Sequence, residues 1–91
     1  MIQIYDSGAA FIAENQTLLD TNPQISAFMV LDAPLLKETG KINYAVKCEK
    51  DEKTLLAMKV EPYNLILFGD ADCAGELLVF LMREGYEIKN Y

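Results

Sequence analysis

The sequence contains no histidine and no tryptophan, and it has only two cysteines. Without histidine the chain lacks the usual general base near neutral pH, which excludes Ser-His-Asp and Cys-His catalysis by this chain alone. Cys48 and Cys73 lie far apart in sequence and have no histidine to join them, so neither a zinc site nor a disulfide framework is indicated. We therefore expect reduced, structural thiols, no metal site and no catalytic residue.

Basic residues are also scarce. Eight Lys and Arg face fourteen Asp and Glu, which gives a net charge of -6. Such a chain repels phosphate backbones and anionic lipid heads, so we expect neither nucleic acid nor membrane as a partner. The apolar residues come in short clusters rather than in the run of about twenty that a bilayer span requires. The beginning of the sequence shows no signal-peptide pattern, and we expect a soluble, cytoplasmic protein.

The length and apolar content of the chain fit one domain with one core over residues 1–91. A chain of this size buries about two-thirds of its unfolded surface. A short strand is predicted from Ile2 to Tyr5, and Asp6 or Ser7 can cap a helix from about Gly8 to Asp20. Asn15 falls in the middle of that helix's apolar face. We expect it to bond a neighbouring backbone group, with a ligand contact as the less favoured alternative. The apolar face consists of Phe11, Ile12, Leu18 and Leu19.

Asn22 and Pro23 are typical of a second helix start, with Asn as the cap and Pro in the first turn. Pro34 removes a helical hydrogen bond, so a kink or break is predicted near Asp32, and Gly40 is expected to end the helix. The apolar stripe predicted for the core side consists of Ile25, Phe28, Met29, Leu35 and Leu36.

The period changes to two from Lys41, which predicts a half-exposed strand. Its apolar face consists of Ile42, Tyr44, Val46 and Cys48, and its other face of Asn43, Lys47 and Glu49. The charged run from Glu49 to Lys53 fits a hairpin turn. A returning strand is then predicted from Thr54 to Glu61, with Leu56, Met58 and Val60 alternating. The segment from Asn64 to Phe68 is apolar on both faces, so we expect it at the centre of the sheet.

Asp70 and Asp72 open a third helix, which is expected to end at Gly85 and to bury Ala74, Leu77, Leu78 and Leu81. A closing strand is predicted from Tyr86 to Tyr91, parallel to the strand before the helix. The fold class is thus α+β, a mixed and mostly antiparallel sheet with three helices in the order β-α-α-β-β-β-α-β. The sequence stops within the last predicted strand, so we expect this domain to be part of a longer protein.

This order resembles the first half of the GNAT N-acetyltransferase fold. Two segments are similar to the N-terminal, non-catalytic domain of a bacterial GNAT subgroup: Phe11-Ile12-Ala13-Glu14-Asn15 through Leu18-Leu19, and Glu61-Pro62-Tyr63-Asn64-Leu65-Ile66-Leu67. The resemblance implies a parent enzyme that transfers acetyl from acetyl-CoA to an amine, with a catalytic acetyltransferase domain in cis. It assigns no catalytic, cofactor-binding or metal residue to this chain.

In catalytic GNAT domains a loop after the fourth strand holds the cofactor pyrophosphate on exposed amides at a helix start. Here the corresponding place, Phe68 to Gly75, carries Asp70 and Asp72, which would engage those amides themselves and repel a pyrophosphate. We therefore expect no acetyl-CoA site in this chain. The stretch Asp32-Ala33-Pro34 is a further departure from the family's second helix.

Four alternatives remain open. In the first, Leu65 to Phe68 and Asp70-Ala71-Asp72 resemble the strand and Asp-x-Asp turn of a haloacid-dehalogenase-like phosphatase, with Asp70 as nucleophile and magnesium ligand, although too few residues follow to complete such a domain. Cys73 in a first helical turn is either a reactive thiol or, as we expect, a buried small hydrophobe. Tyr44, Tyr63, Tyr86 and Tyr91 either line a substrate groove or bridge core and water. The fourth alternative is that the domain acts alone as a binding or dimerisation module, through its sheet edges or the groove beside the kinked second helix.

Overall fold

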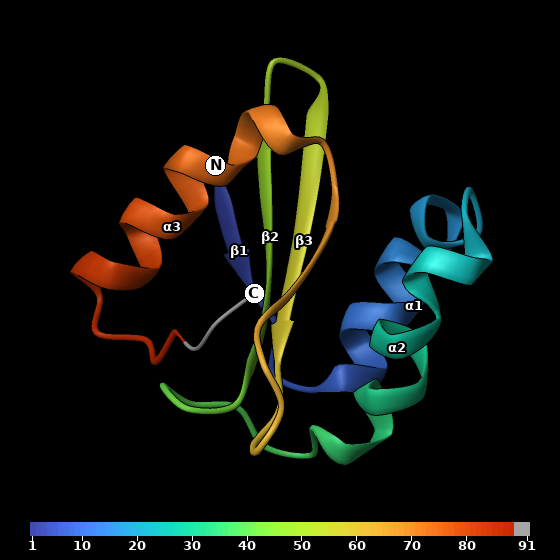
Figure 1. The fold of residues 1–91 in the computed structure, drawn as a ribbon, viewed down its shortest axis with the longest axis horizontal. Coiled ribbons are helices and arrows are strands. Elements are labelled where there is room, and N and C mark those ends of the chain that lie inside the picture. The colour runs from blue at the N-terminus through green and yellow to red at the C-terminus, as the bar shows by residue number, and fades with distance from the viewer. Residues whose placement is uncertain (89–91) are drawn as a thin grey trace.

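A four-stranded antiparallel sheet separates two groups of helices in the computed structural model, which describes residues 1–88 (Figure 1). α1 and α2 lie on one side of the sheet and α3 on the other. The elements are β1 (Ile2–Ile4), α1 (Gly8–Leu19), α2 (Pro23–Asp32), the 3-10 turn η1 (Ala33–Leu35), β2 (Tyr44–Lys50), β3 (Lys53–Lys59), β4 (Ile66–Gly69), the 3-10 turn η2 (Ala71–Cys73) and α3 (Ala74–Arg83). The predicted fold class and order of elements are confirmed.

The predicted closing strand, Tyr86 to Tyr91, extends past the described residues. Its first part, residues 86–88, runs beside the start of β2 without joining the sheet. There the Glu87 amide donates to the Lys41 carbonyl at 2.7 Å. The parallel pairing predicted for this strand also involves residues 89–91, which lie outside the described part of the chain.

The helix starts follow the predicted capping residues. The Ser7 side chain accepts a hydrogen bond from the Ala10 amide at 3.2 Å, and the Asn22 side chain accepts from the Ile25 amide at 3.4 Å. These bonds satisfy amides that have no partner within the helix. Pro34 stops α2 at Asp32 and continues the chain as η1, so the kink is confirmed and the helix ends earlier than Gly40.

A two-residue turn joins β2 and β3. Asp51 and Glu52 both have positive φ, 52° and 66°, and Lys50 pairs with Lys53. This conformation is typical of a type I′ turn, whose twist matches that of the two strands it connects. The predicted hairpin is confirmed.

The strand order is β1-β2-β3-β4, so within residues 1–88 β4 is an edge strand and not the centre of the sheet. The prediction was wrong because residues apolar on both faces show only that both faces are covered. The true centre is β2 and β3, where consecutive residues of each strand are buried. The other face of β2, expected to be exposed, is covered at Ala45 and partly at Lys47, and it is exposed only from Glu49 onward.

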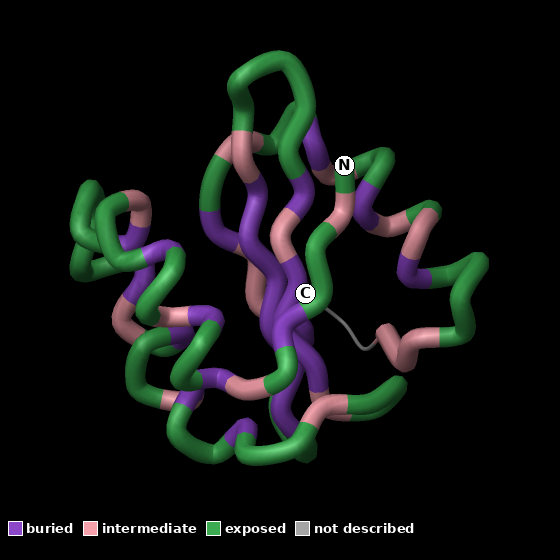
Figure 2. Tube along the Cα trace, turned by 180° about the vertical axis from the view of Figure 1, so that it is seen from behind, coloured by how far each residue is buried: buried purple, intermediate pink, exposed green. Residues whose placement is uncertain are grey.

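The buried residues form two apolar clusters, one on each side of the sheet. Figure 2 shows the buried positions along the strands and at intervals along the helices. The cluster under α1 and α2 is built on Phe11, Leu19, Met29, Leu56 and Met58. The cluster under α3 is built on Tyr44, Val46, Leu55, Leu77 and Leu81. Across residues 1–88, none of the helices combines the length and apolar character that crossing a bilayer demands.

Candidate functional site

The turn between β4 and α3 is the place where the resemblance puts a cofactor loop. The Asp70 side chain accepts a hydrogen bond from the Asp72 amide at 2.9 Å, so its carboxylate occupies the helix start as predicted. The Asp70 amide in turn donates to the Thr54 carbonyl of β3 at 2.8 Å. The turn is therefore tied both to itself and to the sheet.

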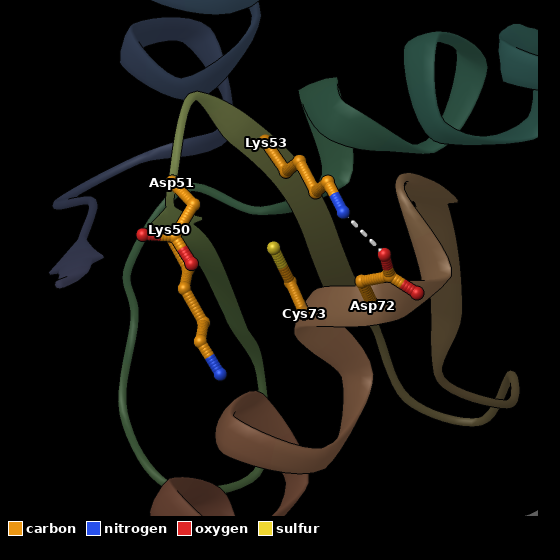
Figure 3. A pocket seen from close by; sticks show the side chains of 5 residues that line it. All are labelled: Lys50, Asp51, Lys53, Asp72 and Cys73. Carbon is orange, nitrogen blue, oxygen red and sulfur yellow. Dashed lines mark hydrogen bonds and ion pairs between the residues drawn. The ribbon is translucent and has the colours of Figure 1, made fainter.

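Asp72 does not cap the helix, in contrast to the prediction. Its carboxylate pairs with the Lys53 ammonium of β3 at 2.5 Å (Figure 3). Lys53, both by its hydrogen bond and by its charge, lowers the pKa of Asp72, so this carboxylate stays ionised. A shallow pocket of about 300 Å³ lies here, with charges of both signs from Lys50, Asp51, Lys53 and Asp72.

For the phosphatase alternative, Asp70 and Asp72 have to present free oxygens to one Mg²⁺ ion. Here Asp70 accepts a backbone amide and Asp72 holds a lysine. Within residues 1–88 no three Cys, His, Asp or Glu side chains come together as a metal-binding group. The geometry favours the capping interpretation of Asp70.

Both thiols are buried in the cluster under α3, as predicted for structural cysteines. Burial, with a hydrogen bond to Glu76, raises the pKa of Cys48 to about 11. The Cys48 thiol donates to Glu76 Oε2 at 3.5 Å. A thiol in this setting stays protonated and unreactive near neutral pH.

Asn15 is buried and bends α1, where its φ of −108° and ψ of 15° depart from helical values. Its Nδ2 donates to the Phe11 carbonyl at 2.8 Å and to the Tyr5 hydroxyl at 3.1 Å. The predicted backbone bond is confirmed. The Tyr5 hydroxyl donates onward to Glu14, which lies 3.6 Å from the Lys47 ammonium. Asn15 thus belongs to a polar network between α1 and β2.

Lys59 of β3 is a buried cation that the sequence interpretation did not single out. Its Nζ donates to Glu61 Oε1 at 2.9 Å and to the Ile42 carbonyl at 3.1 Å, and Glu87 Oε1 lies 3.6 Å away. A buried charge is tolerated only with such compensation. Glu61 is two residues away, but Ile42 and Glu87 are distant in sequence, so the burial of Lys59 does not follow from a local pattern.

The tyrosines separate into two groups. Burial raises the pKa of Tyr44 to about 12, and its hydroxyl donates to the Glu87 carbonyl at 2.8 Å. Tyr86 packs edge-on against the Tyr44 ring and lies under the Lys41 ammonium. Tyr63 is half exposed at a groove, and Tyr91 lies outside the described residues.

The groove at Tyr63 lies between α2 and β4. It has a volume of about 340 Å³ and is lined by Phe28, Asp32, Tyr63, Asn64 and Ile66. The neighbouring outer face of α2 is apolar and exposed: Ile25 at 61%, Phe28 at 69%, Leu31 at 70% and, in η1, Leu35 at 61%. We call these four residues with Tyr63 the α2 face. Ile25, Phe28 and Leu35 were predicted to lie in the core, and that prediction was wrong.

Helix α2 carries apolar residues around its whole circumference, so periodicity alone does not choose its buried side. Of the predicted stripe, only Met29 and Leu36 are buried, together with Ser26 and Ala33. No family model, curated protein or solved structure matches this chain.

Proposed function

We propose that this chain is the N-terminal, non-catalytic domain of a bacterial GNAT-family N-acetyltransferase and that its α2 face docks against the catalytic domain in cis. The parent enzyme would transfer acetyl from acetyl-CoA to an amine. The observation that carries the proposal is the contrast between a β4–α3 turn whose carboxylates are already paired and an α2 face that is apolar and exposed.

The closed turn argues for a non-catalytic role. A pyrophosphate needs several free amides and a net positive surrounding at a helix start. Here Asp70 already uses the Asp72 amide, and the Lys53 charge is matched by Asp72. Binding a cofactor here would require breaking these contacts and bringing like charges together, which costs free energy.

The exposed face argues for a docking role. Contiguous apolar patches on a domain surface mark sites of association, and interfaces between domains of one chain are a common case. The second segment that carries the GNAT resemblance, Glu61 to Leu67, supplies Tyr63, Asn64 and Ile66 to the groove. One of the two segments that resemble the family therefore lies next to the proposed interface.

The first test concerns the cofactor. Calorimetric titration of the chain with acetyl-CoA is expected to give no measurable heat of binding, because the β4–α3 turn offers no anion site. Tight binding by the chain alone would contradict the proposal. Sequencing the reading frame past Tyr91 is the companion test, and a following segment with a GNAT pyrophosphate loop is expected.

The second test concerns the α2 face in the full-length protein. Leu31→Asp and Met82→Asp place the same charge at side chains that are both 70% exposed, one on α2 and one on α3. Leu31→Asp is expected to separate the two domains, seen as faster proteolysis of the linker and a larger radius by small-angle scattering. Met82→Asp is the matched control and should leave both unchanged.

A second candidate, from a different class, is a stand-alone dimerisation module. The observation that favours it is the edge position of β4 in the described sheet, because an edge strand offers unpaired backbone groups to a second copy. Sedimentation of the isolated chain at rising concentration decides between them. A concentration-dependent dimer, together with a stop codon after Tyr91, supports the module and contradicts docking in cis.

A further inference from the structure

We infer that the groove between β1 and α3 binds an extended acidic peptide, which adds as a strand to the outer edge of β1. This surface is distinct from the α2 face and lies at the opposite end of the strand order. The inference combines a free strand edge, an apolar groove beside it and two basic side chains at its rim.

The free edge follows from the hydrogen bonds of β1. Met1 and Glu49 exchange backbone bonds at 2.8 Å in each direction, and the Tyr5 amide donates to the Ala45 carbonyl at 3.0 Å. Bonding in an antiparallel pair alternates along the strand, so Gln3 also faces β2. Ile2 and Ile4 therefore direct their N–H and C=O groups outward. Within residues 1–88, β1 pairs with no strand other than β2.

The groove lies on the same side as the Ile2 side chain. Ile2 pairs with Cys48 and Ile4 with Val46, and both partners belong to the cluster under α3. A volume of about 520 Å³ opens between β1 and α3, with Ile2, Val79 and Phe80 as apolar lining. A strand added to β1 would direct every second side chain into this groove.

Gly75 leaves the groove open at the start of α3, because it has no side chain. A Cβ built at Gly75 would have no atom within 4 Å, so the helix surface is open there. Gly75 is one of the lining residues of the groove. A peptide can therefore approach the start of α3 more closely than a longer side chain would allow.

The charged side chains at the rim of the groove favour a peptide of negative charge. Lys50 forms no salt bridge within residues 1–88, and Arg83 is 68% exposed with its Nε 3.6 Å from Glu84. The acidic lining residue, Glu76, is paired at 3.3 Å with the Met1 ammonium and accepts the Cys48 thiol. In a chain of net charge -6, the lining of this groove thus carries one more positive than negative side chain. Charge complementarity of this kind selects acidic partners.

The spacing of the two basic residues sets the spacing of the acidic ones. Lys50 and Cys73 line one pocket, so Lys50 lies near the start of α3, while Arg83 is its last residue. Ten residues of helix rise about 15 Å, which an extended strand covers in about four to five residues. Acidic side chains at positions i and i+4 of the peptide face the groove together and reach both ends.

The probe is therefore the peptide acetyl-Thr-Glu-Thr-Val-Thr-Glu-Thr-amide, and the control is the same peptide with Lys in place of both Glu. Titration into ¹⁵N-labelled protein is expected to shift the amides of Ile2, Ile4, Gly75 and Val79. The Lys peptide should bind at least about tenfold more weakly, since its charges meet Lys50 and Arg83. Equal affinity of the two peptides, or shifts centred on the α2 face, would overturn the inference.

Two variants test the contribution of the β1 edge and that of the two basic side chains separately. Ile4→Pro removes an outward N–H without removing a β1–β2 bond, and proline is tolerated on edge strands, so binding is expected to disappear while the fold is kept. Lys50→Glu with Arg83→Glu should weaken binding of the Glu peptide about tenfold or more, and the exposed Lys37→Glu is the matched control. If the double charge variant binds as the wild type does, the inference is wrong even where Ile4→Pro fails to fold.

Discussion

Helices α2 and α3 cover opposite faces of one sheet and have the same length of ten residues, but they use their apolar residues differently. α3 is amphipathic: Leu77 and Leu81 are fully buried on its inner side, and two apolar residues, Val79 and Met82, stay exposed. α2 is apolar around its circumference and buries Met29 while it exposes Phe28 and Leu31. The difference shows that folding accounts for the apolar surface of α3 much better than for that of α2.

The two cores differ in a second respect. Under α1 the buried network of Tyr5 and Asn15 leads to Glu14 and Lys47, which are partly open to solvent. Under α3, burial raises the pKa of the Cys48 thiol and that of the Tyr44 hydroxyl. The α3 side of the sheet also holds the buried Lys59 ammonium, since Lys59 is the β3 partner of Tyr44, so the polar groups of this core are inaccessible to solvent.

The largest expected effect tests the difference between the apolar residues of α2 and α3. Leu77→Ala should lower the free energy of unfolding by about 2 to 5 kcal/mol, because it leaves a cavity in the core under α3. Leu31→Ala, at a side chain 70% exposed on α2, should change it by less than about 0.5 kcal/mol. Urea unfolding of both variants measures the two values. Similar losses would contradict the assignment of the α2 face as surplus to folding.

A second test uses pH. Burial raises the pKa of Cys48 from 9.0 to about 11, so the folded state favours the protonated thiol. The stability that this provides is complete below pH 9 and is lost as pH rises toward 11, by up to about 3 kcal/mol for a shift of that size. Urea midpoints measured across this range should fall.

Cys48→Ala is the control for the pH test, because it removes the titrating group. Its midpoint should be lower at neutral pH, through lost packing, but should fall less steeply over the same window. Tyr44, with a pKa raised to about 12, adds a further loss that begins above pH 10 in both proteins. A wild type and variant with parallel pH profiles would show that Cys48 titrates normally in the fold.

Local chemistry allowed much of this fold to be predicted from sequence. The caps at Ser7 and Asn22, the break at Pro34 and the β2–β3 turn depend on residues within four positions of one another. Asn15 was predictable as a satisfied polar group because its bond to the Phe11 carbonyl spans one helical turn. The Asp70 cap has the same local origin.

The features that the sequence did not predict correctly depend on contacts between segments distant in sequence. The position of β4 at a sheet edge, the exposure of Phe28 and the burial of Lys59 are each set by segments distant in sequence. A period of 3.6 identifies the inner side of α3, where one stripe is apolar, but not that of α2. The Lys53 partner that takes Asp72 away from the helix cap lies nineteen residues earlier, and Asp72 itself fits a capping pattern.

The smallest effects come from one substitution made in two helices. At Gly8 of α1 an added Cβ would lie 2.0 Å from the Ala33 carbonyl oxygen of η1, so Gly8→Ala forces the two segments apart and should cost about 1 to 3 kcal/mol. At Gly75 of α3 no atom lies within 4 Å, and Gly75→Ala should stabilise the protein by up to about 1 kcal/mol through helix propensity. Thermal unfolding of both variants gives the two signs. A neutral Gly8→Ala would contradict the close approach of α1 and η1, whereas a destabilising Gly75→Ala would mean that the groove beside β1 is already filled.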